Sequence, residues 1–317
     1  MNKDKPSVQV IKLKPVHLEK IWGGTWLKEE FKFKTKSKNI GESWLISAHP
    51  GGDCRIANSV YKGKTLSELY SLRRDLFADD PHEKFPLLVK LIDAREDLSV
   101  QVHPNDDYAL HNENDVGKSE AWIILNAQPQ TRIQIGHRAR SREELEKLVK
   151  AGEWNKLLAY RKCSKGEIIN IPSGTIHAIC AGTALIEIQQ SSDLTYRLFD
   201  YDRVDKDGRK RDLHLQKSLA VIDVPHRFAK RIFMPRRKDY EALAPILRTP
   251  YFRIGSMRVF DSLFFFNLQH KYYLIAVLEG RGKIGKLSAH KGDSFILTSD
   301  AVKTKFQGQL NLIISTL

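Results

Sequence analysis

The chain has 317 residues, of which 41% are hydrophobic, so it is long enough and apolar enough to bury a core, and it is not a disordered protein. Lysine and arginine outnumber aspartate and glutamate by 52 to 38, and the net charge of +14 favours phosphates and other anions as partners. The lysines of the first 38 residues stand singly between apolar residues, which is typical of solvated strand edges. We therefore expect no nucleic-acid partner.

The three cysteines, Cys54, Cys163 and Cys180, are odd in number and lack a metal-binding spacing. They predict neither a disulfide framework nor a thiolate metal site. The first residues contain no continuous apolar segment of the signal-peptide kind, and no stretch approaches the roughly 18 apolar residues that a membrane span requires. We therefore expect a soluble, cytoplasmic protein without a membrane partner.

Short apolar or alternating segments bounded by turn residues recur along the chain and predict β-strands. They cover residues 8–13, 85–92, 98–102, 121–125, 168–171, 184–189, 252–259, 272–278 and 294–297. Helical patterns are fewer: residues 65–77 and 141–150 each open with a Ser/Thr-x-x-Glu capping signal, and residues 104–113 and 216–222 are shorter. The fold class predicted is mainly β with short helical insertions.

Two ten-residue segments, KGEIINIPSG at 165–174 and KGDSFILTSD at 291–300, resemble each other at a constant offset. Each has the pattern of a turn, a strand and a second turn, and each follows another apolar strand. Two related jelly-roll β-barrels are the economical interpretation, and in such barrels alternate strand residues converge on an interior site. A basic segment near residues 227–243 separates them, which predicts domains at 1–230 and 231–317.

The first of these domains contains a predicted metal site. Gln101 and His103 lie two residues apart in a strand, so both side chains point to one face of the sheet. Glu120 begins another strand, and His177 follows the strand that ends at residue 171. Nitrogen and oxygen donors of this kind suit zinc with an open position, and also iron, manganese or cobalt. At the offset of the repeat His177 is matched by Lys303, so we expect one metal ion per chain.

Several segments around these residues carry a family resemblance: FPLLVKLI at 85–92, LSVQVHPN at 98–105, GKSEAW at 117–122, IPSGTIHA at 171–178, and IEIQQSSD at 186–193 followed by YRL at 196–198. They resemble the type I mannose-6-phosphate isomerases in the short form common in bacteria. The similarity runs from residue 15 to about residue 224. It implies a zinc-dependent isomerase of mannose 6-phosphate and fructose 6-phosphate that acts through a cis-enediolate. It also implies a scaffold of two cupin barrels, the second of them degenerate.

The resemblance assigns roles to individual residues. The metal ligands are Gln101, His103, Glu120 and His177, with Zn²⁺ as the cofactor. The residues that line the sugar-phosphate pocket are Lys90, Ser99, Lys118 and Glu187. Arg197 is the active-site residue, and we expect it to approach from the side opposite the strand of Gln101 and His103. The base that moves the proton stays open among Glu187, Lys118 and a metal-associated water.

Two other functions use the same residues. An iron-dependent cupin oxygenase would bind its metal through His103, Glu120 and His177, although Gln101 as a fourth ligand and the basic surroundings argue against a vacancy for oxygen. A non-catalytic sugar-phosphate-binding cupin is the other alternative, and the complete ligand set together with Arg197 argues against it. The partner that the resemblance implies is a small sugar phosphate, and we expect a monomer or a homodimer.

Overall fold

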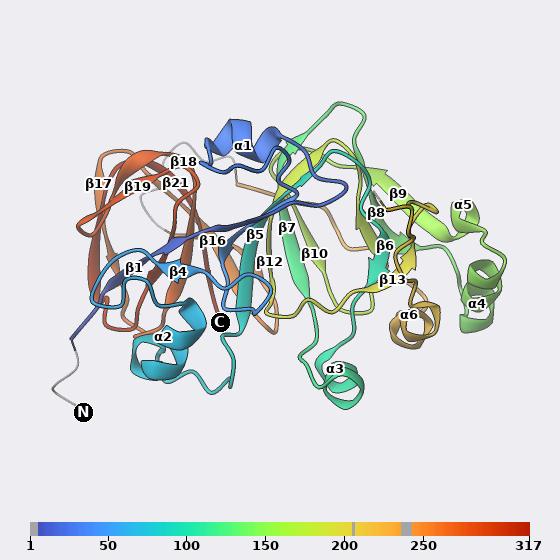
Figure 1. The fold of residues 1–317 in the computed structure, drawn as a ribbon, viewed down its shortest axis with the longest axis horizontal. Helices are drawn as coiled ribbons and strands as arrows, with labels where there is room; N and C mark the ends of the chain where they lie inside the picture. Colours follow the sequence, from blue (N-terminus) through green and yellow to red (C-terminus); the bar gives the residue numbers. More distant parts are fainter. Residues whose placement is uncertain (1–5, 205–206, 236–242) are drawn as a thin grey trace.

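The computed structural model describes residues 6–204, 207–235 and 243–317. Within these residues the strands form three antiparallel sheets, and every segment predicted as a strand overlaps one. Figure 1 shows the C-terminal strands in orange and red at one end of the molecule and the green and yellow strands at the other. The mainly β class is therefore confirmed, and the strand order of each sheet is an open path.

The C-terminal sheet has the strand order β15-β16-β21-β18-β20-β1-β4, with β17 paired to β21 and β19 paired to β18. Its strands are β15 (Ala244–Arg248), β16 (Arg253–Val259), β21 (Lys303–Thr316), β18 (Tyr273–Ile284), β20 (Ser294–Leu297), β1 (Val10–Lys14), β4 (Arg55–Ile56), β17 (Ser262–Phe266) and β19 (Leu287–His290). In the register of β1 and β20, Val10 lies opposite Leu297, so the start of the chain contributes to this sheet. The domain boundary near residue 230 stays a prediction, and residues 236–242 of that segment lie outside the described residues.

The inner sheet has the order β14-β10-β7-β12-β5-β3-β2, and the outer sheet has the order β13-β6-β11-β8-β9. The strands of the inner sheet are β14 (Ile232–Phe233), β10 (Glu167–Ile171), β7 (Glu120–Ala127), β12 (Thr183–Gln190), β5 (Leu87–Ala94), β3 (Glu42–Ile46) and β2 (Val16–Leu18). Those of the outer sheet are β13 (Tyr196–Phe199), β6 (Val100–Val102), β11 (His177–Ile179), β8 (Arg132–His137) and β9 (Leu158–Lys162).

The inner sheet is covered on both faces. Ile123 and Ile186 on one face belong to an apolar cluster that includes Ile296 of the C-terminal sheet. Ile124 on the opposite face packs in a second cluster with Ile133 of the outer sheet. Every residue of β5 and β12 is buried as a result, so each polar side chain on these strands requires a partner.

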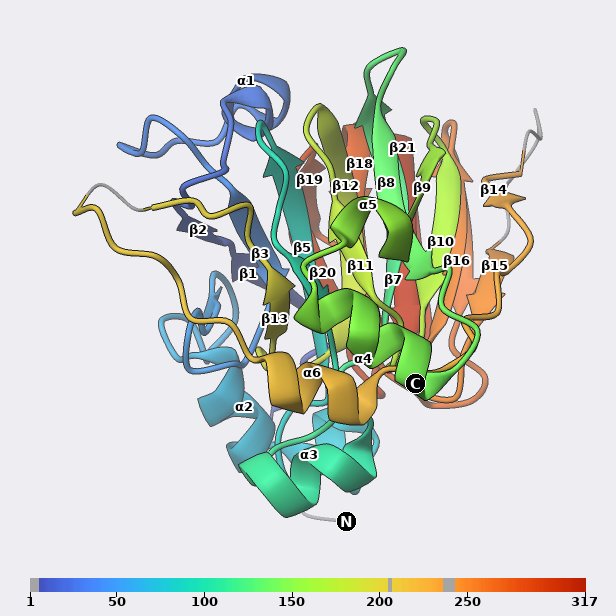
Figure 2. The same ribbon diagram turned by 90° about the vertical axis from the view of Figure 1, so that its right-hand side faces the viewer.

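The helices are short and lie at the ends and edges of the sheets. They are α1 (Trp26–Phe31), α2 (Leu66–Leu72), the 3₁₀ helix η1 (Arg74–Phe77), α3 (Asp106–Glu113), α4 (Arg142–Lys150), α5 (Trp154–Leu157) and α6 (Leu215–Val221). In the turned view of Figure 2, α4, α5 and α6 lie in front of the strands of the outer sheet. None of the helices in the described part of the chain is both long and apolar enough to span a membrane.

The predicted capping signals are confirmed. The Thr65 hydroxyl accepts from the amide of Glu68, and the Glu68 side chain accepts from the amide of Thr65, which is a complete capping box. The Ser141 hydroxyl accepts from the amide of Glu144 in the same way. The prediction of one helix over residues 65–77 is wrong, because Arg73 leaves the helical region, with φ −135° and ψ 59°, and the chain continues as η1.

Candidate functional site

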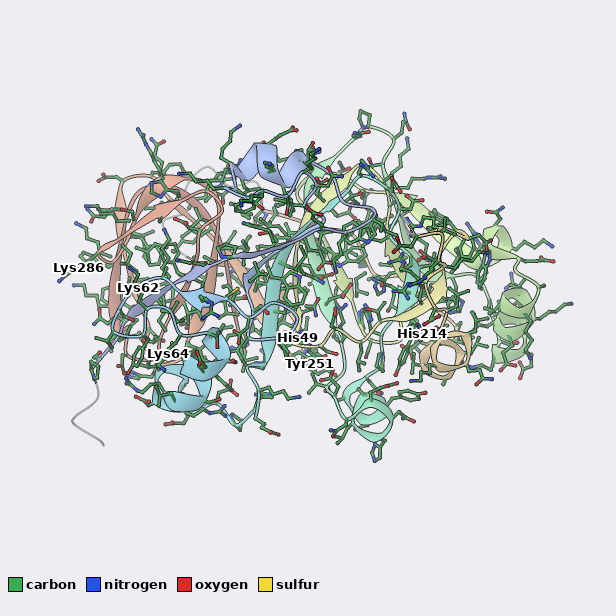
Figure 3. All side chains as sticks on the ribbon, in the orientation of Figure 1. His49, Lys62, Lys64, His214, Tyr251 and Lys286 are labelled. Carbon is green, nitrogen blue, oxygen red and sulfur yellow. The ribbon has the colours of Figure 1, made fainter. Side chains whose placement is uncertain are left out.

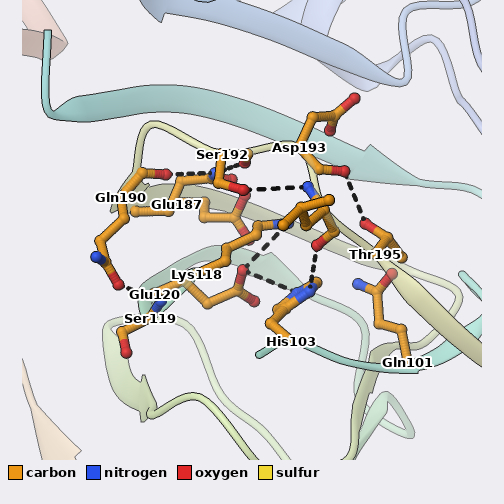
Figure 4. A network of polar contacts seen from close by, with 12 residues as sticks. Gln101, His103, Lys118, Ser119, Glu120, Glu187, Gln190, Ser192, Asp193 and Thr195 are labelled. Carbon is orange, nitrogen blue, oxygen red and sulfur yellow. Dashed lines mark hydrogen bonds and ion pairs between the residues drawn. The ribbon is translucent and has the colours of Figure 1, made fainter. Parts of the chain in front are cut away.

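Three of the predicted metal ligands meet between the inner and outer sheets. His103, Glu120 and His177 are each 1% exposed, and one potential ligand atom from each lies within 4.8 Å of the others. Figure 4 shows two members of this cluster, His103 and Glu120, with polar neighbours such as Gln101 and Lys118. The residues come from separate parts of the chain, so the fold and not the local sequence brings them together.

Strand pairing places these side chains. Glu120 begins β7, where it lies opposite Ile171 of β10. His177 begins β11 directly opposite Gln101 of β6, and the two side chains lie 3.3 Å apart, from Nε2 to Nε2. The assignment of N and O in an amide follows from its hydrogen bonds, so Gln101 can present its oxygen at this position by turning its amide over. The fourth predicted ligand is thus adjacent to the cluster.

Both histidines are held in the tautomer in which Nδ1 carries the proton and Nε2 does not. Nδ1 of His103 donates to the carbonyl of Leu194 at 2.8 Å, and Nδ1 of His177 donates to the carbonyl of Thr175 at 2.9 Å. Their Nε2 atoms lie 3.4 and 3.3 Å from the two carboxylate oxygens of Glu120. Nε2 of His103 and Oε2 of Glu120 are buried without a hydrogen bond, which is rare for buried polar atoms. A metal ion with nitrogen and oxygen ligands fits this arrangement.

The electrostatics favour the protonation states that bind metal. Burial, helped by the positive charge of Lys118, lowers the pKa of His103 well below its ordinary value, and burial likewise lowers the pKa of His177. Burial acts to raise the pKa of Glu120, but the positive charges of Lys118 and Lys90 help to hold that pKa below its usual range. At neutral pH the cluster therefore consists of two neutral imidazoles and one carboxylate.

The predicted pocket residues surround this cluster. Lys90 and Glu187 lie opposite each other in β5 and β12 and form a buried ion pair of 2.7 Å between Nζ and Oε2. Burial acts against the charge of Lys90, but Glu187 and Glu42 outweigh burial and raise its pKa. Nζ of Lys118 lies 3.6 Å from Oε2 of Glu120. The result is two buried cations beside the cluster, an environment suited to an anionic group of a ligand.

Ser99 lies next to β6 along the chain, whereas Arg197 lies beside β6 on the neighbouring strand of the sheet. Ser99 is buried just before that strand. Arg197 of β13 pairs directly with Gln101, so the expected approach from the opposite side is wrong: the loop after β12 returns the chain to the edge of the same sheet. Residues paired in this way point to the same face, which puts Arg197, Gln101 and His177 in one row.

The Arg197 side chain is only partly tied down. Its Nη1 donates to the carbonyl of Asp212 at 2.9 Å, while its Nε is buried without a hydrogen-bond partner. Its backbone amide donates to Nδ1 of His214, a residue labelled in Figure 3. Burial, together with the nearby Arg211, lowers the pKa of Arg197, although a guanidinium stays protonated at neutral pH. Unused donor capacity remains for a ligand.

Two tryptophans, Trp122 and Trp44, and the carboxylate of Glu42 were assigned no role from the sequence. Nε1 of Trp122 donates to Oε1 of Glu120 at 3.0 Å and to Oε1 of Glu187 at 2.8 Å. Nε1 of Trp44 donates to Glu42 at 2.7 Å, and Glu42 is one of the charges around Lys90. A signal for both pairs exists in the sequence, because a Glu-x-Trp spacing in a strand places the carboxylate and the indole on one face.

The comparisons with known proteins agree with this geometry. Residues 10–134 match the family described as phosphomannose isomerase type I, catalytic domain. The mannose-6-phosphate isomerase ManA of Bacillus subtilis is 40% identical over 311 residues, which cover 96% of this chain and 98% of that protein. The mannose-6-phosphate isomerase of Streptococcus mutans is 39% identical over 94% of this chain and 95% of that protein.

The crystal structure of the mannose 6-phosphate isomerase from Bacillus subtilis superimposes with a TM-score of 0.89 at 37% identity, over 98% of this chain and 100% of that one. The similarity therefore includes the C-terminal sheet as well as the two sheets that enclose the cluster. The predicted enzyme class is confirmed: the chain belongs to the family of type I mannose-6-phosphate isomerases.

Proposed function

We propose that this protein interconverts mannose 6-phosphate and fructose 6-phosphate with the help of a divalent metal ion held by His103, Glu120 and His177, with Gln101 as a fourth ligand. The observation that carries the proposal is that Nε2 of His103 and Nε2 of His177 lie 3.4 and 3.3 Å from the buried carboxylate of Glu120. Zn²⁺, one ion per chain, is the metal that this donor set favours. When bound, the ion supplies a Lewis acid that polarises the sugar carbonyl or orders its hydroxyl groups.

The other residues of the site supply binding and proton transfer. The isomerisation moves a proton between C2 and C1 through a cis-enediolate, so the site must hold a base beside the carbon and stabilise oxyanion charge. Glu187 is buried next to the cluster and Lys118 lies on its other side, and either can serve as the base. Arg197 faces the same space with an unused donor, which suits it to stabilising the developing charge.

Binding of the phosphate is assigned to the cations, with Ser99 as a further donor. We expect Lys118→Met to reduce kcat/KM for the sugar phosphate by roughly 10- to 100-fold, as the loss of a charged hydrogen bond of about 1.5 to 3 kcal/mol requires. The unphosphorylated sugar should lose little. An equal loss for both sugars would instead assign Lys118 to proton transfer or to the metal environment.

The direct test of the function is a coupled assay for fructose 6-phosphate formation from mannose 6-phosphate. The purified protein is measured as isolated, after treatment with a chelator, and after readdition of Zn²⁺, and its metal content is determined by elemental analysis. We expect about one ion per chain, loss of activity with the ion, and recovery with zinc. Isomerase activity that survives complete removal of metal would overturn the metal-dependent mechanism.

We further infer that both β units are cupin jelly rolls, with residues 1–230 as the catalytic domain and residues 231–317 as a degenerate one. Support comes from the repeated turn and strand before β10 and β20 and from the placement of the cluster between two facing sheets. The cytoplasmic location and the monomeric or dimeric state expected from the sequence stay predictions.

A further inference from the structure

We propose that Trp122 is a positioning residue, whose single indole N–H group holds a metal ligand and a substrate-binding carboxylate in their working orientations. The inference rests on the proposed function, because it assumes that Glu120 binds the ion and that Glu187 contacts the sugar. It adds a residue for which the family motif gives no role.

The geometry places Trp122 between the two carboxylates. It is 0% exposed in β7, two residues after Glu120 and directly opposite Glu187 of β12. Both carboxylates therefore lie on the same face of the inner sheet as the indole. Nε1 lies 3.0 Å from Oε1 of Glu120 and 2.8 Å from Oε1 of Glu187, so one proton is shared by both.

The shared proton matters because the two acids are buried side by side. Two negative charges in a low-dielectric interior repel each other strongly, and a positive group between them offsets this repulsion. Lys90 pairs with Oε2 of Glu187, and Lys118 lies on the Oε2 side of Glu120, so the indole supplies the positive end of a dipole to the two remaining oxygens. Without it, Oε1 of Glu187 would face Glu120 with no donor between them.

Trp122 also contacts a second metal ligand. Its ring lies edge-on to the imidazole of His177, with ring centroids 5.4 Å apart and planes at 77°. The hydrogen bond from Nε1 to Glu120 is an outer contact of the kind that fixes the orientation of metal ligands, and the loss of such a bond typically weakens metal binding by about 10- to 100-fold. A phenylalanine keeps an aromatic ring next to His177 but has no N–H group, so Trp122→Phe removes the shared proton with little loss of packing.

The chain provides a matched control three strands along the same sheet. Trp44 of β3 is 1% exposed and donates to Glu42, two residues before it, at 2.7 Å. This is the same indole-to-carboxylate pairing in the same sheet, but its hydrogen bond goes to neither Glu120 nor Glu187. Trp44→Phe therefore imposes the same chemical change and a similar cost in stability.

The experiment measures zinc affinity without reference to activity. Metal-free wild type, Trp122→Phe and Trp44→Phe are titrated with Zn²⁺ in competition with a chromogenic chelator, after circular dichroism has shown that each is folded. We expect zinc binding by Trp122→Phe to be about 10- to 100-fold weaker than in the wild type, and that by Trp44→Phe to change less than about threefold. Trp122→Met, which also lacks the N–H group, is measured with the same expectation if the phenylalanine variant fails to fold.

A second measurement separates the two carboxylates. At zinc concentrations that saturate each protein, the kcat of Trp122→Phe should be at least tenfold lower than that of the wild type. Glu187 lacks the indole N–H donor in this variant even when the ion is bound. Equal zinc affinity in the two tryptophan variants would overturn the proposal. If the wild type itself bound no zinc, the proposed function would fail instead, so the two failures are distinguishable.

Discussion

The turns before β10 and β20 are built alike, yet only one of these strands lies beside the metal cluster. Gly166 and Gly292 adopt φ of +82° and +89°, a left-handed conformation that favours glycine. Each donates its amide to the neighbouring strand at 2.8 Å, Gly166 to the carbonyl of Ile124 and Gly292 to that of Val277. The repeat seen in the sequence is thus a repeat of backbone structure.

The two units share this backbone arrangement, but the side chains at matching interior positions differ. Trp122 pairs with Ile169 in the inner sheet, and its counterpart Ile275 pairs with Phe295 in the C-terminal sheet. Both registers follow from the same turn, so the strands can be compared residue by residue. The polar residues of the site correspond to apolar or aromatic ones: Tyr273 stands for Glu120, Ile275 for Trp122 and Ile314 for Glu187.

The counterpart of His177 differs in direction as well as in type. His177 points into the space between two sheets, whereas Lys303 is exposed, with Nζ 4.2 Å from the centre of the Phe264 ring. The neighbouring residues Phe265 and Phe306 fill the interior. The same backbone framework therefore encloses a polar site in one unit and an apolar core in the other. Buried polar atoms require hydrogen-bond or charge partners, and the apolar core has no such requirement.

The largest expected effect comes from removing a ligand. His177→Ala should abolish most metal binding and lower activity by more than about a hundredfold, because the remaining groups cannot complete the coordination. Elemental analysis and the coupled assay check both quantities. His290→Ala, which removes an exposed histidine of the C-terminal sheet, is the control and should change neither. Full activity in His177→Ala would rule out the assigned cluster.

The next effect concerns stability alone. Phe295 is fully buried in the C-terminal unit, at the position that Ile169 has in the inner sheet. Phe295→Ala should lower the free energy of unfolding by about 3 to 5 kcal/mol, measured in urea, because it leaves a cavity. Zinc affinity of the folded variant should stay at the wild-type value. A drop in zinc affinity at a temperature where the variant is folded would contradict the separation of core and site.

The next prediction concerns Arg197, which lies in β13 at the edge of the outer sheet. We expect Arg197→Lys to keep the charge, the metal content and the melting temperature while lowering kcat about a hundredfold, which corresponds to about 2.7 kcal/mol of transition-state stabilisation. The structural alternative is that Arg197 only anchors the segment around Asp212 through its Nη1. That alternative predicts the reverse pattern, a lower Tm with near-normal kcat, so both are measured on one preparation.

The sequence predicted part of the strands and the metal cluster for local reasons, but it gave no strand for β8, β9 or the 14-residue β21. Residues 294–297 were predicted as a strand and form β20, because a short apolar run between turns leaves few other conformations. His103, Glu120 and His177 could be found because charged or metal-binding residues at strand ends inside an apolar framework stand out. The short helix α1 was missed, since fewer than two turns leave almost no periodicity to detect.

Long-range pairing and backbone contacts could not be predicted in this way. Nothing near Val10 indicates that it will pair with Leu297, because strand pairing carries no local signal at that separation. The carbonyls of Leu194 and Thr175 fix the histidine tautomers, but a backbone carbonyl has no residue identity to read. The position of Arg197 was misjudged for a related reason, because the direction in which a loop returns depends on the packing of the whole sheet.

The smallest effect tests the contact that joins the two units. The hydroxyl of Tyr272, next to β18, donates to Oδ2 of Asp80 at 2.7 Å, and the amide of His82 donates to Oδ1 at 2.9 Å. Burial acts to raise the pKa of Asp80, but these hydrogen bonds outweigh it and the pKa is lowered. A carboxyl group with a lowered pKa stabilises the folded state above the pKa of the unfolded chain, about 4, and this stability is lost as the pH falls through the folded value.

Tyr272→Phe removes one of those donors and moves the pKa of Asp80 back toward its usual range. The variant should be about 1 to 2 kcal/mol less stable than the wild type at pH 7, where Asp80 is ionised in both states. Below about pH 4 the difference should shrink, because the protonated carboxyl no longer depends on the charged hydrogen bond. Urea unfolding at pH 7 and pH 3 measures it, with Tyr273→Phe as the control, since among the described residues that hydroxyl donates to no carboxylate. A difference that stays constant with pH would show that the hydroxyl, and not the charge of Asp80, carries the contact between the units.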